Sequence, residues 1–193
     1  MAIRATFAQR VRDLLAALAD KLHFIDEMGT DLGMTPRYGR AAPGQRVVEA
    51  TSGFSGPRYT SVAALTLRGL HAPFVFPGTL DGPAFETYVE HCLGPELAAG
   101  DIVLMDNLSP HKHAVIRALI EARGATIEFL PPYSPDLNPI EQAWSKAKAY
   151  LRQIKARTYD ELLNALAIAL RSISPQDAAG WFAHCGYALS PLG

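Results

Sequence analysis

The sequence predicts an α/β fold, a mixed five-stranded sheet flanked by helices. Two apolar, β-branched runs at residues 59–67 and 72–77 lie close enough together to form a hairpin. Two later runs, residues 101–106 and 126–130, are separated by a stretch with helical periodicity, as in parallel strands joined by a crossover helix. With 193 residues, of which 49% are hydrophobic and 19% charged, the chain has the composition of one globular domain.

The first part of the chain supplies one helix and one strand. Residues 7–20 are predicted to form an amphipathic helix, because apolar side chains recur there at helical spacing. The first strand follows at residues 21–27. Residues 30–57 are rich in Gly, Pro and Arg, which favours turns with room for one hairpin. The predicted division is an N-terminal helix at 1–20, a remnant or a linker, and a main domain at 21–193.

The rest of the chain alternates helices and strands. One helix is expected to begin at Asp81 and to run to about residue 97. A second is expected over residues 111–123, with Ser109 as its cap and Pro110 at its first position. Three helices finish the chain, near residues 139–154, 159–172 and 175–184.

This order, a three-strand meander followed by two strands joined through a helix, is that of the ribonuclease H fold. Right-handed crossovers would place the strands that end at Asp26 and Asp106 side by side and parallel, with their carboxyl ends at one edge. Glu141 opens a helix after a proline-rich turn. Three carboxylates that converge at a sheet edge suit Mg²⁺, and a pair of such ions about 4 Å apart promotes in-line displacement at phosphorus.

Each acidic position also has a purely structural interpretation. Asp26 before a glycine is often a turn residue, because aspartate hydrogen-bonds its own backbone there. Asn138 and Glu141 have the spacing of a capping box, in which the two side chains satisfy the first amides of a helix. Glu27 would point to the opposite face of its strand from Asp26, so it is the weaker candidate.

Positive charge gathers around the third acidic block, although the formal net charge of the whole chain is only −1. Residues 111–157 hold eight Lys or Arg against four Asp or Glu. This excess is either a solvated helix face or a set of contacts to a phosphate backbone. The candidate DNA contacts are Lys112, Lys146, Lys148 and Arg152. The candidate neighbours that would orient the acidic ligands are Asn107, His111 and Asn138.

Residues 24–27, 105–112 and 130–144 together resemble the catalytic domain of mariner-superfamily DDE transposases, in the bacterial insertion-sequence branch (IS six-thirty-like). Asp106 and Glu141 lie 35 residues apart, which is similar to the short second interval of that superfamily. Residues 39–46 also look like a segment of this branch. The resemblance covers most of the chain, from about residue 22 to 187.

The resemblance implies a ribonuclease H-like DDE catalytic domain and a defined chemistry. Asp26, Asp106 and Glu141 would form the Asp-Asp-Glu triad and hold two Mg²⁺ (or Mn²⁺) ions. The chain would cut DNA at the terminal inverted repeats of an insertion sequence and join the ends to a TA-containing target. It would act as a homodimer in the bacterial cytoplasm, associated with the nucleoid when it acts on DNA.

The chain also departs from full-length members of this family, which carry a pair of helix-turn-helix modules before the catalytic domain. Only about 20 residues precede the first strand here, so the chain looks like a second reading frame that frameshifting fuses to a DNA-binding half. An alternative is a catalytically inert fragment that acts only as an oligomerisation or inhibitory module. A third possibility is a nuclease of the same fold that acts on RNA–DNA hybrids, against which the proline-rich block argues.

Two further features bear on compartment and cofactor. Cys92 and Cys185 show no CxxC spacing, so neither a zinc site nor a redox motif is expected. Two lone cysteines suit a reducing cytosol. No run approaches the roughly 18 apolar residues that a membrane span needs.

Overall fold

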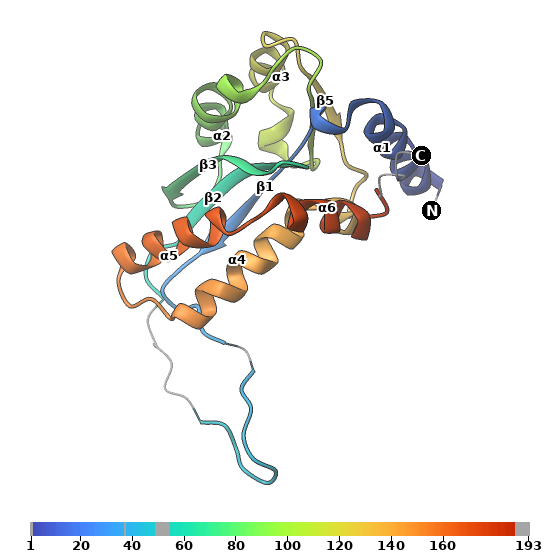
Figure 1. Cartoon of the computed structure of the whole chain (residues 1–193). Coiled ribbons are helices and arrows are strands. Elements are labelled where there is room, and N and C mark those ends of the chain that lie inside the picture. The colour runs from blue at the N-terminus through green and yellow to red at the C-terminus, as the bar shows by residue number, and fades with distance from the viewer. Residues whose placement is uncertain (1, 37, 49–54, 188–193) are drawn as a thin grey trace.

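The computed structural model describes residues 2–36, 38–48 and 55–187. Its five strands form one sheet in the order β3-β2-β1-β4-β5. The strands are β1 (Leu22–Thr30), β2 (Tyr59–Thr66), β3 (Gly69–Pro77), β4 (Ile102–Met105) and β5 (Thr126–Phe129). This mixed sheet with helices on both sides confirms the predicted α/β architecture (Figure 1).

The helices flank the sheet in two groups. The α-helices are α1 (Ala2–Leu18), α2 (Gly82–Tyr88), α3 (Ala114–Glu121), α4 (Ile140–Ile154), α5 (Tyr159–Arg171) and α6 (Pro175–His184). The shorter turns are η1 (Ala19–Lys21), η2 (Val89–Leu93), η3 (Gly94–Glu96), η4 (Ser109–Lys112) and η5 (Pro135–Leu137); η2 is a π-helical turn and the others are 3₁₀ turns.

The strand pairing confirms the prediction that β1 and β4 are parallel neighbours. β1 runs antiparallel to β2 and parallel to β4, so that Phe24 lies opposite Leu65 on one side and Leu104 on the other. β4 is in turn parallel to β5. The carboxyl ends of β1, β4 and β5 therefore share one edge of the sheet, where ligand sites of α/β proteins usually lie.

Two hydrophobic cores lie on the two faces of the sheet. Phe24 and Leu104 belong to the core that α1, α4, α5 and α6 cover, together with the fully buried Trp144. Ile25 and Val103 belong to the core under α2 and α3. Because side chains alternate along a strand, residues 24, 26 and 28 of β1 face α4. This alternation decides which face Asp26 takes.

Two predicted helices differ from the structure. The helix expected over 111–123 is divided into η4 and α3, because His113 between them has an extended backbone (φ −64°, ψ 138°). Ser109 is therefore not the cap of α3, whose N-cap residue His113 makes no capping side-chain hydrogen bond. The helix expected to run to residue 97 breaks into α2, η2 and η3. Pro95 in η3 lacks the amide that an α-helix would need there.

The chain before β1 packs onto the sheet rather than standing apart. α1 begins at Ala2 instead of residue 7, and its Val11 and Leu15 are buried in the core that contains α4. After β1 a long segment extends away from the body of the molecule (Figure 1). Its described residues contain no strand, so the hairpin allowed by the sequence is not found among them; residues 49–54 lie outside the described part. No described helix is both long and apolar enough to cross a membrane.

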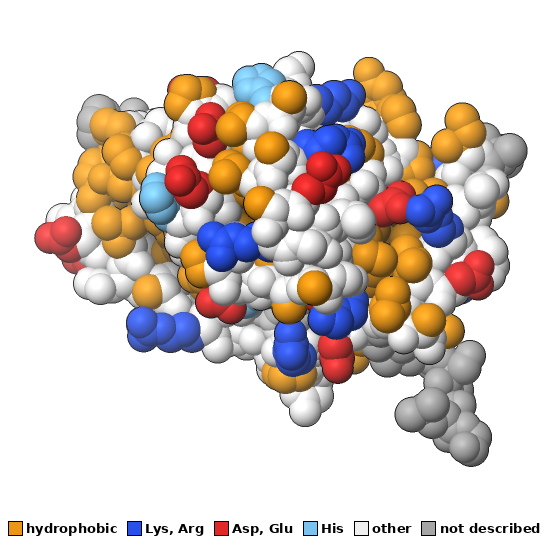
Figure 2. All heavy atoms as spheres, turned by 90° about the horizontal axis from the view of Figure 1, so that it is seen from above, with side chains coloured by type: hydrophobic (Ala, Val, Ile, Leu, Met, Phe, Trp, Pro, Cys, Tyr) orange, Lys and Arg blue, Asp and Glu red, His pale blue; other side chains and the backbone are white. Residues whose placement is uncertain are grey.

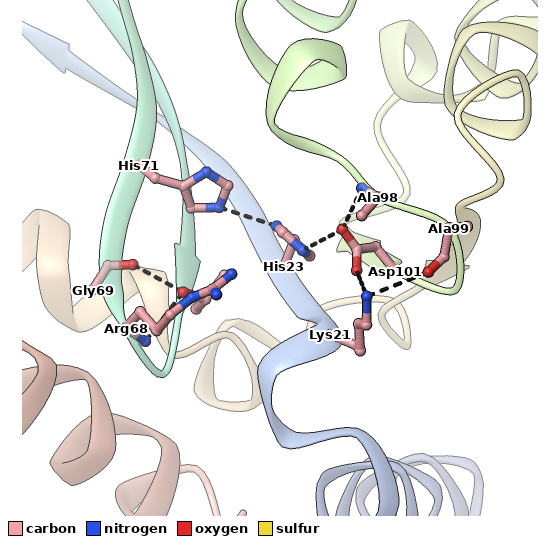
Figure 3. A network of polar contacts seen from close by, with 9 residues as sticks. Lys21, His23, Arg68, Gly69, His71, Ala98, Ala99 and Asp101 are labelled. Carbon is pink, nitrogen blue, oxygen red and sulfur yellow. Dashed lines mark hydrogen bonds and ion pairs between the residues drawn. The ribbon is translucent and has the colours of Figure 1, made fainter.

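A chain of polar contacts crosses the sheet at the end away from Asp26 (Figure 3). His23 on β1 has its Nδ1 atom 3.0 Å from Nε2 of His71 on β3. Nε2 of His23 lies 3.2 Å from Oδ2 of Asp101, whose Oδ1 lies 3.1 Å from the Lys21 ammonium. Burial lowers the pKa of His23, an effect that the charge of Asp101 only partly offsets. Burial also lowers the pKa of His71 to about 4, with further contributions from His23 and Arg68.

These shifts predict a defined pH dependence of stability. Unfolded His71 titrates near its ordinary value of about 6.5, so between about pH 6.5 and pH 4 the unfolded chain binds more protons than the folded one. The contribution of His71 to the free energy of unfolding is therefore present at neutral pH and is lost as pH falls through that window. Urea unfolding should show a larger acid loss for the wild-type chain than for His71→Gln. Parallel pH profiles of the two proteins would contradict this assignment.

Candidate active site

The two strand-end aspartates lie on adjacent parallel strands and on the same face. Asp26 is in β1, and Asp106 follows the last residue of β4. The register that sets Phe24 opposite Leu104 reaches Asp26 and Asp106 when it is continued by two residues. Since alternate residues share a face, both carboxylates point toward the side of the sheet that α4 covers. The sequence-based prediction that these strands lie side by side is confirmed.

Glu141 reaches the same place from α4. It is the second residue of that helix, and the neighbouring Ala143 and Trp144 are buried in the core beneath. Asp26, Asp106 and Glu141 all line one pocket of about 370 Å³. The other residues of its wall are Asn107, Leu108, Leu130, Pro131, Pro132, Tyr133, Ser134, Pro135 and Asn138. Three elements distant in sequence thus bring three carboxylates to one pocket.

The negative charge in this pocket is poorly compensated by the protein. Burial raises the pKa of Asp26 well above its usual range, and the nearby carboxylates of Glu27, Glu141 and Asp106 raise it further. A bound cation would remove this repulsion by balancing the charge. A bound cation near Asp26 would therefore be electrostatically favourable.

His111 holds Asp106 from the opposite face of the sheet. The imidazole is buried, its Nδ1 lies 2.7 Å from Oδ1 of Asp106, and its ring centroid lies 4.3 Å from that of Phe85. Burial pushes the pKa of Asp106 up. The His111 contact, the Leu108 amide and nearby positive charge outweigh that effect, and the net pKa is lowered. Asp106 is thus kept ionised, and the hydrogen bond from the Leu108 amide to its Oδ1 helps to orient it.

Glu27 takes part in this arrangement, although the sequence marked it as the weaker candidate. It does point to the other face from Asp26, and there its Oε2 lies 4.0 Å from Nε2 of His111. Burial raises the pKa of Glu27, while the His111 charge opposes that rise. The sequence indicated His111 as a candidate neighbour of the acidic ligands, but it did not indicate that this histidine would lie close to both Asp106 and Glu27.

The two asparagines near the pocket behave differently from one another. The Asn107 amide nitrogen donates to the Leu130 carbonyl and so ties the chain after β4 to the chain after β5. Asn138 does not cap α4 as the capping-box interpretation expected. The N-cap is Pro139, which offers no capping side chain. The Asn138 Oδ1 atom is instead buried without a protein hydrogen-bond partner.

The residues of the pocket fit a hard divalent cation. Carboxylate and amide oxygens are the ligands that Mg²⁺ prefers, and Asn138, whose amide oxygen is buried without a protein partner, is one of the residues that line the pocket. Within the described residues, no three His, Cys, Asp or Glu side chains are close enough together to enclose one ion. Magnesium sites commonly use one or two protein carboxylates and complete the shell with water and substrate phosphate oxygens. The arrangement therefore suits ions that are shared with a phosphate substrate.

The four candidate DNA contacts fall in three different places. Lys148 and Arg152 line a second, polar hollow of about 450 Å³ beside the carboxyl end of β1. Lys146 instead donates to the Ser172 carbonyl and lies 2.6 Å from Oδ2 of Asp177 near the start of α6. Lys112 lines a small hollow next to β5. On the face seen in Figure 2, basic and acidic side chains are interspersed rather than gathered into one basic field.

Arg58 is a cation that sequence reasoning missed. It lines the same hollow as Lys148 and Arg152, and its guanidinium lies directly against Gly29 of β1. A Cβ at Gly29 would lie only 1.9 Å from Nη2 of Arg58. Glycine within a strand often marks such a close approach, and this was the available signal. Within the described part of the chain, none of these three cations has an ion-pair partner.

Comparisons with known proteins agree with this arrangement. The family model described as "DDE superfamily endonuclease" matches residues 21–163. The chain is 30% identical over 89 residues to the transposable element Tc1 transposase of Caenorhabditis elegans, covering 46% of this chain and 33% of the relative. It is 27% identical over 100 residues to the Tcb1 transposase of Caenorhabditis briggsae, covering 50% and 37%. The matched regions span about a third of the length of these curated relatives.

Solved structures share the fold. The Mos1 strand transfer complex superposes with a TM-score of 0.72 at 15% identity, covering 95% of this chain and 56% of that one. The Mos1 transposase catalytic domain with raltegravir and Mg superposes with a TM-score of 0.65 at 15% identity, covering 95% and 87%. These likenesses confirm the ribonuclease H-like architecture. The family model covers well over half of the chain, and on that ground the chain belongs to the DDE superfamily of endonucleases.

Proposed function

We propose that this chain is a transposase catalytic domain of the bacterial insertion-sequence branch (IS six-thirty-like), cleaving DNA at element ends and joining them to a target. In this proposal Asp26, Asp106 and Glu141 hold two Mg²⁺ or Mn²⁺ ions. The observation that carries the proposal is the meeting of these three carboxylates, from β1, the end of β4 and α4, in one pocket. Family membership supports the same chemistry.

Each pocket residue has a physical task in this proposal. When bound, a metal pair activates the attacking water or 3′-hydroxyl and stabilises the leaving oxygen. His111 helps to keep Asp106 ionised, and the Leu108 amide donates a hydrogen bond that orients it. Asn107 ties together the chains that follow β4 and β5, both of which line the pocket. The buried oxygen of Asn138 offers an acceptor for a metal-bound water.

The DNA backbone would follow α4 away from the carboxylates. Lys148 and Arg152 lie seven and eleven residues beyond Glu141, which is about 10 and 16 Å along a helix that rises about 1.5 Å per residue. One strand of duplex DNA presents a phosphate about every 3.4 Å along its axis. We therefore assign Arg58, Lys148 and Arg152 to phosphates roughly three to five nucleotides from the cleaved bond.

Recognition of a particular element end needs more than these contacts. Phosphate contacts position a protein on DNA but carry no sequence information. A formal net charge of −1 also gives the whole chain little general attraction for DNA. We infer that a helix-turn-helix half, joined by frameshift fusion, reads the terminal inverted repeats and that the assembly is a homodimer acting on a TA-containing target.

Calorimetric titration with Mg²⁺ or Mn²⁺ tests the metal assignment directly. The wild-type chain and Asp106→Asn would be titrated alone and with a nicked DNA duplex present. We expect binding heat for the wild-type chain that grows when DNA supplies phosphate oxygens, and little heat for the variant. Equal heats for the two proteins would refute the role of Asp106. Absence of binding under both conditions would favour the inert-fragment alternative.

A further inference from the structure

Tyr133 combines two properties that a folded chain usually avoids. Its side chain is 97% exposed, although it is a large aromatic residue. Its backbone has φ +53°, a left-handed conformation that is unfavourable for a non-glycine residue. Neither the exposure of the ring nor the left-handed backbone stabilises the isolated chain. Strain and exposure that coincide in one residue point to a ligand rather than to folding.

The turn that presents Tyr133 is held rigidly on both sides. Pro131 and Ser134 are buried, and the Ser134 hydroxyl donates to the Pro132 carbonyl over 3.2 Å. The Ser134 carbonyl accepts from the amide of Leu137. The Tyr133 carbonyl itself accepts from Arg4 of α1. The backbone is therefore fixed and the aromatic ring is left outside it, with no aromatic or hydrogen-bonded neighbour among the described residues.

The ring stands on the wall of the carboxylate pocket. Asp26, Asp106 and Glu141 supply the acidic part of that wall. Leu108 and Tyr133, with Leu130 and three prolines, supply an apolar part. Leu108 is itself 45% exposed, and its amide donates to Oδ1 of Asp106. Leu108, which carries this exposed apolar surface, is therefore directly hydrogen-bonded to Asp106, a proposed metal ligand.

We infer that Tyr133 stacks on an unpaired nucleobase next to the phosphate held at the carboxylates. This inference rests on the proposed function, since it takes the substrate at the carboxylates to be a DNA phosphodiester. A nucleotide has its charged phosphate and its flat apolar base one sugar apart. The phosphate would meet the carboxylates through the proposed cations, and the base would then lie near the apolar part of the pocket. A base inside a duplex cannot offer its face to a side chain, so the stacked base must be unpaired. Stacking on an aromatic ring tolerates any base, so this contact would add affinity for the DNA without reading its sequence.

Fluorescence of 2-aminopurine tests this stacking directly. The probe is a short DNA duplex with a single 2-aminopurine in an unpaired overhang at one end, mixed with the full chain in Ca²⁺. We expect wild-type protein and Tyr133→Phe to quench the probe, and Tyr133→Ala not to. Base–aromatic stacking is worth about 1–3 kcal/mol, so Tyr133→Ala should bind the overhang about 5- to 150-fold more weakly. Tyr38→Ala, which removes another exposed tyrosine outside the pocket, is the matched control.

An abasic overhang separates stacking from any change in the turn itself. If Tyr133 stacks on a base, removing that base should make wild-type protein and Tyr133→Ala bind equally. An affinity loss that persists on abasic or fully paired DNA would overturn the inference, as would no quenching by the wild-type chain. A change in sedimentation of Tyr133→Ala without any base dependence would assign the ring to a protein contact instead. Metal-dependent plasmid nicking, measured in parallel, reports on the proposed function independently of these binding results.

Discussion

Replacement of Asp106 with asparagine is expected to reduce metal-dependent DNA cleavage by about 10³-fold or more. A metal ion in such a site contributes several kcal/mol of transition-state stabilisation, and each 1.36 kcal/mol corresponds to about a factor of ten in rate. Asparagine preserves the shape of the side chain but removes the negative charge that His111 holds in position. Mn²⁺-dependent nicking of supercoiled plasmid DNA measures the effect. Asp26→Asn and Glu141→Gln should give losses of similar size, because all three residues line the same pocket.

A carboxylate outside the pocket provides the control. Asp136 lies close in sequence to Glu141, but it pairs with Arg4 on the surface and does not line the pocket. Asp136→Asn should therefore keep nearly full nicking activity. Circular dichroism and thermal unfolding of each variant would show whether the fold is retained. An active Asp106→Asn, or an equally inactive Asp136→Asn, would remove the basis for assigning this pocket to catalysis.

The position of two of these carboxylates could be predicted because strand geometry is simple. Side chains alternate along a strand, and right-handed crossovers make β1 and β4 parallel neighbours, which sets Asp26 and Asp106 side by side. The position of Glu141, which lies on a helix, could not be predicted from strand geometry. Its placement depends on how α4 packs through Ala143 and Trp144, and that packing is decided by the whole core.

Contacts that depend on tertiary packing could not be predicted from the sequence in the same way. Asn138 fits a capping box in sequence, yet the helix begins at Ile140 with Pro139 as its cap, and the asparagine oxygen is left for the pocket. His111 was a candidate neighbour of the acidic ligands, but its surroundings could not be predicted, because the helix expected over residues 111–123 breaks at His113. Local sequence rules choose between hydrogen-bond partners that are close in the chain. They do not rank those partners against groups that tertiary packing brings nearby.

The hollow beside β1 predicts the second large effect. The triple variant replaces Arg58, Lys148 and Arg152 of this hollow with glutamine. It should make the dependence of log affinity on log salt less steep by about 2.7, because each duplex phosphate contact contributes about 0.9 to that slope. At about 0.1 M salt this corresponds to roughly 10²- to 10³-fold weaker DNA binding. The loss should be similar for unrelated DNA sequences, because phosphate contacts carry no sequence information. Fluorescence anisotropy over a range of salt concentrations measures both quantities.

Three arginines elsewhere on the molecule test whether DNA binding depends on the position of the cations or only on their number. Arg68 follows β2, Arg123 follows α3 and Arg171 ends α5, and none of them lines the carboxylate pocket or the hollow beside β1. Their triple replacement by glutamine removes the same charge from the chain. If charge alone governed binding, both triple variants would lose the same affinity and the same salt dependence. If the backbone follows α4 from Glu141 to Arg152, only the first variant loses them. A methylphosphonate placed three to five nucleotides from the cleaved bond should then weaken DNA binding by the wild-type chain. It should not weaken binding by the variant that lacks Arg58, Lys148 and Arg152.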